Sequence, residues 1–262
     1  MRRLLTFACE GAELGASLDE AAGATGLLIV VGGSQTRIGS HRMFERLAKA
    51  VAAAGHPCLR FDRRGVGDSA GEDPGWRDSG PDIAAAAAAA FRREAPGVTR
   101  IVALGLCDGA GALCLHGAAA GVDELILVNP WLVEASENAP APAALRRHYR
   151  ERLTTFAGWR KLLTGSISYT SALRGILRAG NKTQDATSRA LAAALRDSGL
   201  PATWILAEGD ATAVAAAHEL GKRHWRGLAD RRTMIPTDSH TFARPGDAAA
   251  LEQAVLAALA SG

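Results

Sequence analysis

Short apolar runs alternate along this chain with longer, alanine-rich segments. After a first strand that ends before Glu10, β-like runs predict strands at residues 27–31, 57–61, 100–104, 124–129, 203–207 and 232–235, and the run at 27–31 is unbroken apolar. Helices are expected at residues 40–54, 82–95, 108–119, 212–223 and 246–260. Strands without polar alternation are typical of a parallel sheet covered on both faces. The order of elements therefore predicts an α/β fold with a doubly wound, mostly parallel sheet.

One stretch interrupts this alternation. About 70 residues separate the strand that ends at Asn129 from the strand that begins at Thr203, which is more than one crossover needs. The stretch opens with an Ala/Pro linker at residues 139–142 and then has the pattern of several helices. We therefore expect a core made of residues 1–133 and 201–262, with a helical cap inserted at 134–200.

Composition indicates a soluble globular protein. The chain has 262 residues, of which 48% are hydrophobic and 22% charged. The basic and apolar start resembles a signal peptide, but its apolar run is short and has no clean cleavage site. No run approaches the roughly 20 apolar residues of a membrane span. We expect a cytoplasmic protein without a membrane span.

Positive charge is concentrated in the predicted cap. Residues 146–198 hold eleven Lys or Arg against three acidic residues, a net of +8, whereas the whole chain carries +3. A basic cap over an acidic core favours an anionic substrate, and a solvated basic face is the alternative. The cap also holds four aromatic residues, which either line an acyl pocket or pack the cap helices together. They are Tyr149, Phe156, Trp159 and Tyr169.

Four cysteines occur, with no C-x-x-C pair and no zinc-site spacing. Cys9, Cys58 and Cys114 are interpreted as small buried apolar residues. Cys107 differs because it lies in Gly-Leu-Cys-Asp-Gly at 105–109, between an apolar strand and a helix of small residues. Such a strand–turn–helix presents a nucleophile on a strained turn, with small flanking residues where strand and helix pass closely.

The turn supplies more than the thiol. The N-terminus of the following helix favours the thiolate form of Cys107, and the N–H of Asp108 is a donor for a developing oxyanion. Because glycine occurs 29 times in the chain, the G-x-C-x-G pattern alone is weak. A Gly-Gly-Ser turn after the strand at 27–31 strengthens it, since the N–H of Ser34 is placed to be the second oxyanion donor. Asp108 as the nucleophile is a minor alternative, because it lies one position after the place that the two glycines of the pattern give to the nucleophile.

An acid and a histidine follow Cys107 in the order that completes a triad. Asp210 comes just after the strand at 203–207, and His240 lies in the loop after the last strand. The carboxyl ends of parallel strands gather at one edge of a sheet, so these side chains should meet Cys107 there. Glu208 and Asp238 are the alternative acids, and Asp210 as a plain helix N-cap is the structural alternative.

The remaining histidines fall on predicted helices, turns or the cap, where solvated or packing roles are expected. They are His41, His56, His116, His148, His218 and His224. Of these, His41 lies close to the predicted oxyanion turn and either lines the pocket or begins a helix.

With these residues in place, the chain resembles the α/β-hydrolase superfamily over nearly its whole length, including the D-x-R-G-x-G-x-S loop at 62–69. More narrowly, it resembles the exosortase A system-associated hydrolases of type 1. The stretches that carry the narrower resemblance are residues 5–11, 39–42, 60–62, 105–110, 129–131 and 156–163. Ser34 stands where that group has proline. The resemblance implies a bacterial protein encoded beside exopolysaccharide and protein-sorting genes, and it implies no particular substrate.

We therefore expect a hydrolase of an ester, lactone or thioester, using Cys107, His240 and Asp210 through a thioester acyl-enzyme. Substrate contacts are assigned to Gly33, Gln35, Trp131 and Trp159. The expected partner is a small-molecule or saccharide acyl ester. The alternatives are an acyltransferase with the same triad and a non-catalytic scaffold with this fold. No motif supports a metal, a cofactor, a nucleotide or nucleic acid.

Overall fold

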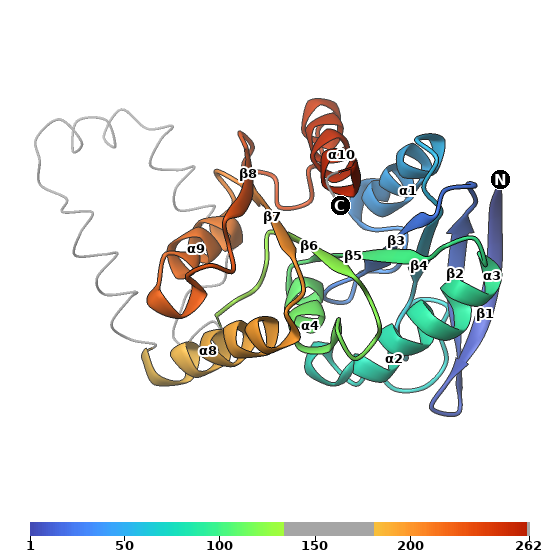
Figure 1. Ribbon diagram of the computed structural model, residues 1–262, viewed down its shortest axis with the longest axis horizontal. Helices are drawn as coiled ribbons and strands as arrows, with labels where there is room; N and C mark the ends of the chain where they lie inside the picture. Colours follow the sequence, from blue (N-terminus) through green and yellow to red (C-terminus); the bar gives the residue numbers. More distant parts are fainter. Residues whose placement is uncertain (134–180, 261–262) are drawn as a thin grey trace, which may run out of the picture. The chain divides into compact units, whose positions relative to one another are not determined.

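The computed structural model describes residues 1–133 and 181–260, and one mixed sheet forms the centre of this part (Figure 1). Its strand order is β1-β2-β4-β3-β5-β6-β7-β8. The strands are β1 (Arg2–Cys9), β2 (Ala12–Asp19), β3 (Thr25–Val30), β4 (Cys58–Phe61), β5 (Arg100–Leu106), β6 (Glu124–Val128), β7 (Ala202–Ala207) and β8 (Arg231–Ile235). Strands β3 to β8 pair in parallel, while β2 pairs antiparallel with both β1 and β4. The predicted mostly parallel α/β sheet is confirmed.

Strand β2 was not predicted, because its pattern hides it. Six consecutive residues of β2 are buried, yet they include Gly15, Ser17 and Asp19, so neither an apolar run nor an alternation is visible. The polar ones are satisfied by contacts: Asp19 accepts hydrogen bonds from Arg2 and from the buried Arg60. The hairpin with β1 turns at Glu10 and Gly11, both in the left-handed region.

Helices cover both faces of the sheet, with α1 and α10 on one face and α2 and α4 on the other (Figure 1). The helices are α1 (Met43–Ala53), α2 (Gly80–Ala84), α3 (Arg92–Glu94), α4 (Asp108–His116), α8 (Asn181–Ser198), α9 (Ala211–Leu220) and α10 (Pro245–Ala260). Three short 3-10 turns join them: η1 (Ser40–Arg42), η2 (Trp76–Asp78) and η4 (Arg223–Trp225).

Two predicted helices differ in detail from those observed. The segment expected at 82–95 contains a π-helical turn, η3 (Ala85–Phe91), between α2 and α3. The helix expected from residue 40 begins regularly at Met43, because His41 and Arg42 before it have φ of 55° and 59°.

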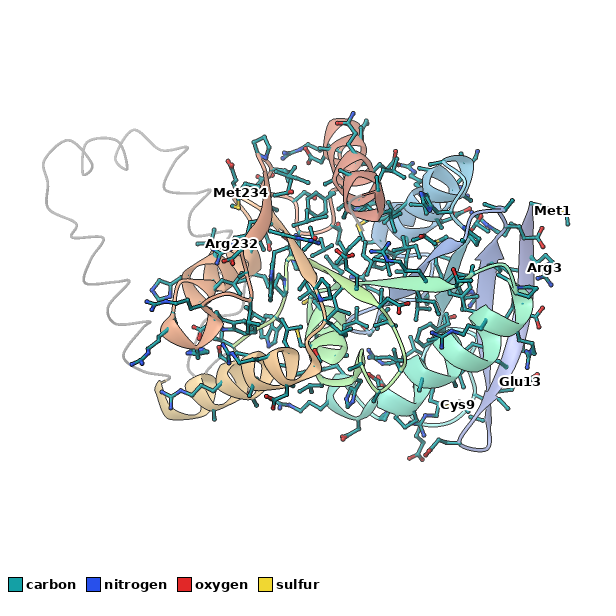
Figure 2. The ribbon with its side chains drawn as sticks, in the orientation of Figure 1. Met1, Arg3, Cys9, Glu13, Arg232 and Met234 are labelled. Carbon is teal, nitrogen blue, oxygen red and sulfur yellow. The ribbon has the colours of Figure 1, made fainter. Side chains whose placement is uncertain are left out.

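The core lies where the central strands are covered on both faces. Strands β3, β5 and β6 are almost wholly buried, with Leu27, Val102 and Ile126 each at 0% exposure. The edges differ: Figure 2 shows Arg232 and Met234 on β8 at one edge of the sheet and Met1 and Arg3 at the β1 edge. Because β3, β5, β6 and β7 run parallel to one another, their carboxyl ends lie at the same edge of the sheet.

The chain divides into two compact units, residues 1–132 with 189–262, and residues 133–188. Most of the cap predicted at 134–200 lies outside the described residues, as do Trp159 and the other cap aromatics. Helix α8 is the part of that segment that is described. In the described residues, no helix combines the length and the apolar character needed to cross a membrane.

Candidate active site

Cys107 lies in a tight turn between β5 and α4. Its backbone has φ 59° and ψ −121°, a combination that non-glycine residues seldom adopt. The Cys107 N–H donates to the carbonyl of Val128 at 3.0 Å. Its own carbonyl accepts from the N–H groups of Ala110 at 3.2 Å and Trp131 at 2.9 Å. These bonds hold the strained conformation, and the thiol stays partly accessible.

The glycines beside Cys107 are required by close backbone packing. A Cβ at Gly105 would lie 2.5 Å from the carbonyl oxygen of Gly109, and one at Gly109 would lie 2.6 Å from that of Val30. Both obstacles are backbone atoms, which cannot rotate away. The backbones of β5, α4 and β3 touch directly here, which explains why the sequence has small residues at these positions.

His240 and Asp210 meet at the same edge of the sheet. His240 Nδ1 lies 2.8 Å from Asp210 Oδ2, and Asp210 is 3% exposed. The same oxygen accepts the N–H of Ala213 at 3.0 Å, so Asp210 is also the N-cap of α9. Asp210 therefore both contacts His240 and caps α9. Of the alternative acids, Glu208 is exposed and Asp238 pairs with Arg244 at 2.8 Å.

The surroundings of His240 favour its protonated form. Burial by itself lowers the pKa of His240, but hydrogen bonds and charge interactions with Asp210 and Cys107 outweigh it and raise the pKa to about 9. Because Cys107 is among the groups that raise this pKa, its thiol lies near the imidazole that Asp210 holds. A protonated imidazole near a thiol can act as its acid–base partner.

Asn129 ties the loops that carry these groups. It is fully buried, follows β6 directly, and has a φ of 39°. Its amide donates to the carbonyl of His240 at 2.9 Å, and its Oδ1 accepts the N–H of Ala207 at 2.8 Å. One carboxamide therefore links the ends of β6 and β7 to the loop of His240.

The turn after β3 lies against the start of α4. The N–H of Gly33 donates to Asp108 Oδ1 at 2.6 Å, and the carbonyl of Gly33 accepts from Arg63 at 2.5 Å. The Ser34 N–H has no hydrogen-bond partner among the residues that the structure describes. The N–H of Asp108 is at the first position of α4, where no intrahelical partner exists.

Farther along the same turn, side chains close the loop on itself. Oε1 of Gln35 accepts from the N–H and the hydroxyl of Ser40, at 3.1 and 3.3 Å. The fully buried carboxylate of Asp62 accepts from the N–H and the guanidinium of Arg37, and from the N–H of Asp68 at 3.2 Å. Asp62 thus joins residues 33–39 to the loop 62–69.

The other predicted site residues are placed as follows. Trp131 is bonded through its N–H to Cys107 and is partly exposed, whereas Trp159 lies outside the described residues. His41 is exposed and lines a small hollow with residues 241–243, next to His240. Asn129 and Arg63 were not singled out for the site, since their contacts join segments far apart in sequence. The one signal in the sequence that could have pointed to these two residues is that each lies at or just after the end of a predicted strand.

No group of three or more His, Cys, Asp or Glu side chains within residues 1–133 and 181–260 is arranged to hold a metal ion. What Cys107, His240 and Asp210 offer chemically is a partly accessible thiol near an imidazole that a carboxylate holds.

Comparison with known proteins gives one family and many similar folds. No curated protein sequence matches the chain. The esterase Pf2001 of Pyrococcus furiosus is similar at a TM-score of 0.62 and 14% identity, covering 98% of this chain and 92% of its own. Est1E of Butyrivibrio proteoclasticus, solved with ferulic acid, is similar at 0.63 and 16%, covering 98% and 100%. The thioesterase domain of the curacin biosynthetic pathway is similar at 0.59 and 14%, covering 98% and 99%.

At identities of 14–16%, the similarity to these three structures shows the fold alone. The model of the "Alpha/beta hydrolase family" matches residues 27–256, which include every strand from β4 to β8, the turn at Cys107, and both Asp210 and His240. This chain belongs to the Alpha/beta hydrolase family.

Proposed function

We propose that the protein hydrolyses carboxylic esters or thioesters, lactones included, with Cys107 as the nucleophile, His240 as the acid–base and Asp210 as its orienting carboxylate. The observation that carries this proposal is the 2.8 Å hydrogen bond between Asp210 and His240, together with the strained turn of Cys107, whose thiol helps to raise the pKa of that imidazole. All three follow the carboxyl ends of β5, β7 and β8, where a parallel sheet gathers its active site.

Acylation begins from the thiolate–imidazolium pair. The thiolate of Cys107 attacks the carbonyl carbon, and the π electron pair of the C=O bond moves to oxygen. The N–H groups of Ser34 and Asp108 donate hydrogen bonds to the resulting oxyanion. As the tetrahedral intermediate collapses, the bond to the leaving group breaks and the imidazolium of His240 gives that group its proton. The products are an alcohol or thiol and a thioester on Cys107.

Deacylation reverses the roles of the same groups. The now neutral His240 takes a proton from water, and the hydroxide attacks the thioester carbonyl. The Cys107 thiolate leaves, the acid is released, and the charged pair with His240 is restored. Throughout, Asp210 Oδ2 fixes which imidazole nitrogen faces Cys107, because it accepts the proton on Nδ1.

The substrate class follows from the nucleophile and from the similar proteins. A thiolate reacts best with carbonyls whose leaving group departs easily, which favours esters, lactones and thioesters over amides. Proteins with similar folds are named as an esterase and a thioesterase domain. The resemblance to the exosortase A system-associated hydrolases supports an acyl ester of an exopolysaccharide system, and the net positive charge of residues 146–198 supports an anionic one.

The test is turnover with a trapped intermediate. The wild-type protein should hydrolyse p-nitrophenyl acetate, and mass spectrometry after rapid acid quenching should find one acetyl group on Cys107. The Cys107→Ala variant should do neither, whereas Cys114→Ala, which removes a buried thiol, should do both. Hydrolysis that survives in Cys107→Ala would disprove the assignment of the nucleophile.

A further inference from the structure

The peptide group between Gly33 and Ser34 is held from one side by a guanidinium. Arg63 Nη2 donates to the Gly33 carbonyl at 2.5 Å. That carbonyl and the Ser34 N–H belong to the same trans peptide unit, in which C=O and N–H point in opposite directions. An Arg63 that fixes the carbonyl therefore also sets the direction of the Ser34 N–H.

Arg63 is itself rigidly placed. Its Nε and Nη2 donate to the two carboxylate oxygens of Asp73 at 2.9 and 3.0 Å, a bidentate pair. Asp73 in turn accepts the N–H of Gly75 at 2.9 Å, and the hydrogen bond from Arg63 lowers the pKa of Asp73. With only 11% of its side chain exposed, Arg63 has little freedom to leave the Gly33 carbonyl.

The peptide unit on the other side of Gly33 is fixed as well. The Gly33 N–H donates to Asp108 Oδ1, and a Cβ at Gly32 would lie 2.2 Å from that oxygen. Both dihedrals of Gly33, whose φ is 60°, are therefore determined by side chains from two other segments. Between these two anchors, the Ser34 N–H is the group that stays without a partner among the described residues.

We propose that Arg63 is a positioning residue for the oxyanion hole, which aims and polarises the Ser34 N–H by binding the carbonyl of the same peptide. This inference rests on the proposed function. A charged donor on the carbonyl shifts electron density along the amide and makes its N–H a stronger donor. The effect is needed only when negative charge develops on the substrate oxygen, so it acts on the transition state of acylation and not on the reactivity of the thiolate.

The experiment compares two reactions of the same thiol. Acylation by p-nitrophenyl acetate passes through an oxyanion, whereas alkylation by iodoacetamide displaces iodide from a saturated carbon and forms none. In Arg63→Met the rate of acylation should fall about 10- to 100-fold, mainly in kcat, while the rate of alkylation stays within about twofold of the wild type. Arg63→Lys should recover part of the acylation rate, and Asp73→Asn should show a smaller loss of the same kind.

Arg92→Met is the matched control, because Arg92 also donates to a glycine carbonyl, that of Gly121 at 2.6 Å, on an exposed part of the surface. It should leave both rates unchanged. An equal fall of acylation and alkylation in Arg63→Met would show a general disturbance of Cys107 and overturn the inference, and so would unchanged acylation. A wild type that is not acylated at all would overturn the proposed function, and this inference with it.

Discussion

The amide of Asn129 donates a 2.9 Å hydrogen bond to the backbone carbonyl of His240, across 111 positions of the chain. The loop that carries the imidazole is thereby attached to the centre of the sheet, because Asn129 follows β6 and also binds the N–H of Ala207. The position of His240 relative to Asp210 and Cys107 therefore depends on this buried polar contact as well as on the packing of the loop.

Removing that carboxamide should cost stability. Asn129→Ala leaves the His240 carbonyl and the Ala207 N–H without partners in a buried place, so we expect the free energy of unfolding to fall by about 2–4 kcal/mol. Urea denaturation with an unchanged m-value is the measurement. Asn129→Asp, which keeps an acceptor for Ala207 but sets a carboxylate against the His240 carbonyl, should also destabilise. A loss below about 1 kcal/mol in both variants would contradict the role given to Asn129.

The two roles of Asp210 can be separated by substitution. Asn caps helices about as well as Asp, so Asp210→Asn should keep most of the stability of α9, while Asp210→Ala should lose about 1 kcal/mol more. Both variants remove the negative charge, so the pKa of His240 should fall from about 9 and the ester hydrolysis rate should drop about a thousandfold. Histidine titration by NMR and kcat measurements check this. An Asn variant with full activity would exclude Asp210 from the triad.

Stability should depend on pH through His240. Its pKa is raised from 6.5 to about 9 on folding, so the stabilising effect of its proton is complete below about pH 6.5 and is lost as the pH rises through 9. The expected loss between these limits is on the order of 2–3 kcal/mol. Urea titrations at pH 6.5 and 9.5 should show it in the wild type and not in His240→Gln. Equal pH dependence in both proteins would contradict the assignment.

Thiol reactivity should single out one cysteine. Burial raises the pKa of Cys114 to about 12, and burial with a hydrogen bond to Asp82 raises that of Cys9 to about 11. Burial raises the pKa of Cys58 as well. At pH 6, iodoacetamide should therefore modify Cys107, beside its imidazolium, far faster than these three. Peptide mapping of the alkylated protein measures this, and uniform slow labelling of all four would favour a non-catalytic scaffold.

The turn at Cys107 should tolerate no side chain where its backbones touch. Gly105→Ala would place a Cβ 2.5 Å from the Gly109 carbonyl oxygen and should cost about 3 kcal/mol or more. Gly246→Ala is the control: it lies in α10 with nothing within 4 Å, so it should be neutral or stabilise by up to about 1 kcal/mol. Thermal unfolding of both variants decides the matter, and a stable Gly105→Ala would contradict the observed packing.

The apolar runs were enough to predict β3, β5 and β6, since these strands are almost wholly buried and are polar only at their first residue. They were not enough for β2, whose buried Ser17 and Asp19 are satisfied by partners on other segments. Order along the chain placed Asp210 and His240 correctly at one edge, because parallel strands bring their carboxyl ends together. The contacts of Arg63 and Asn129 could not be predicted in this way, because they depend on which distant backbone groups lack a partner.

Asp62 has a consequence for anyone who redesigns this protein. Its buried carboxylate binds Arg37 from the turn after β3 and the N–H of Asp68 from its own loop, so the two loops form one mechanical unit. A single loop taken from another member of the Alpha/beta hydrolase family would arrive without its counterpart and leave the buried charge of Asp62 or Arg37 without a partner. These two loops therefore have to be replaced together, as a pair.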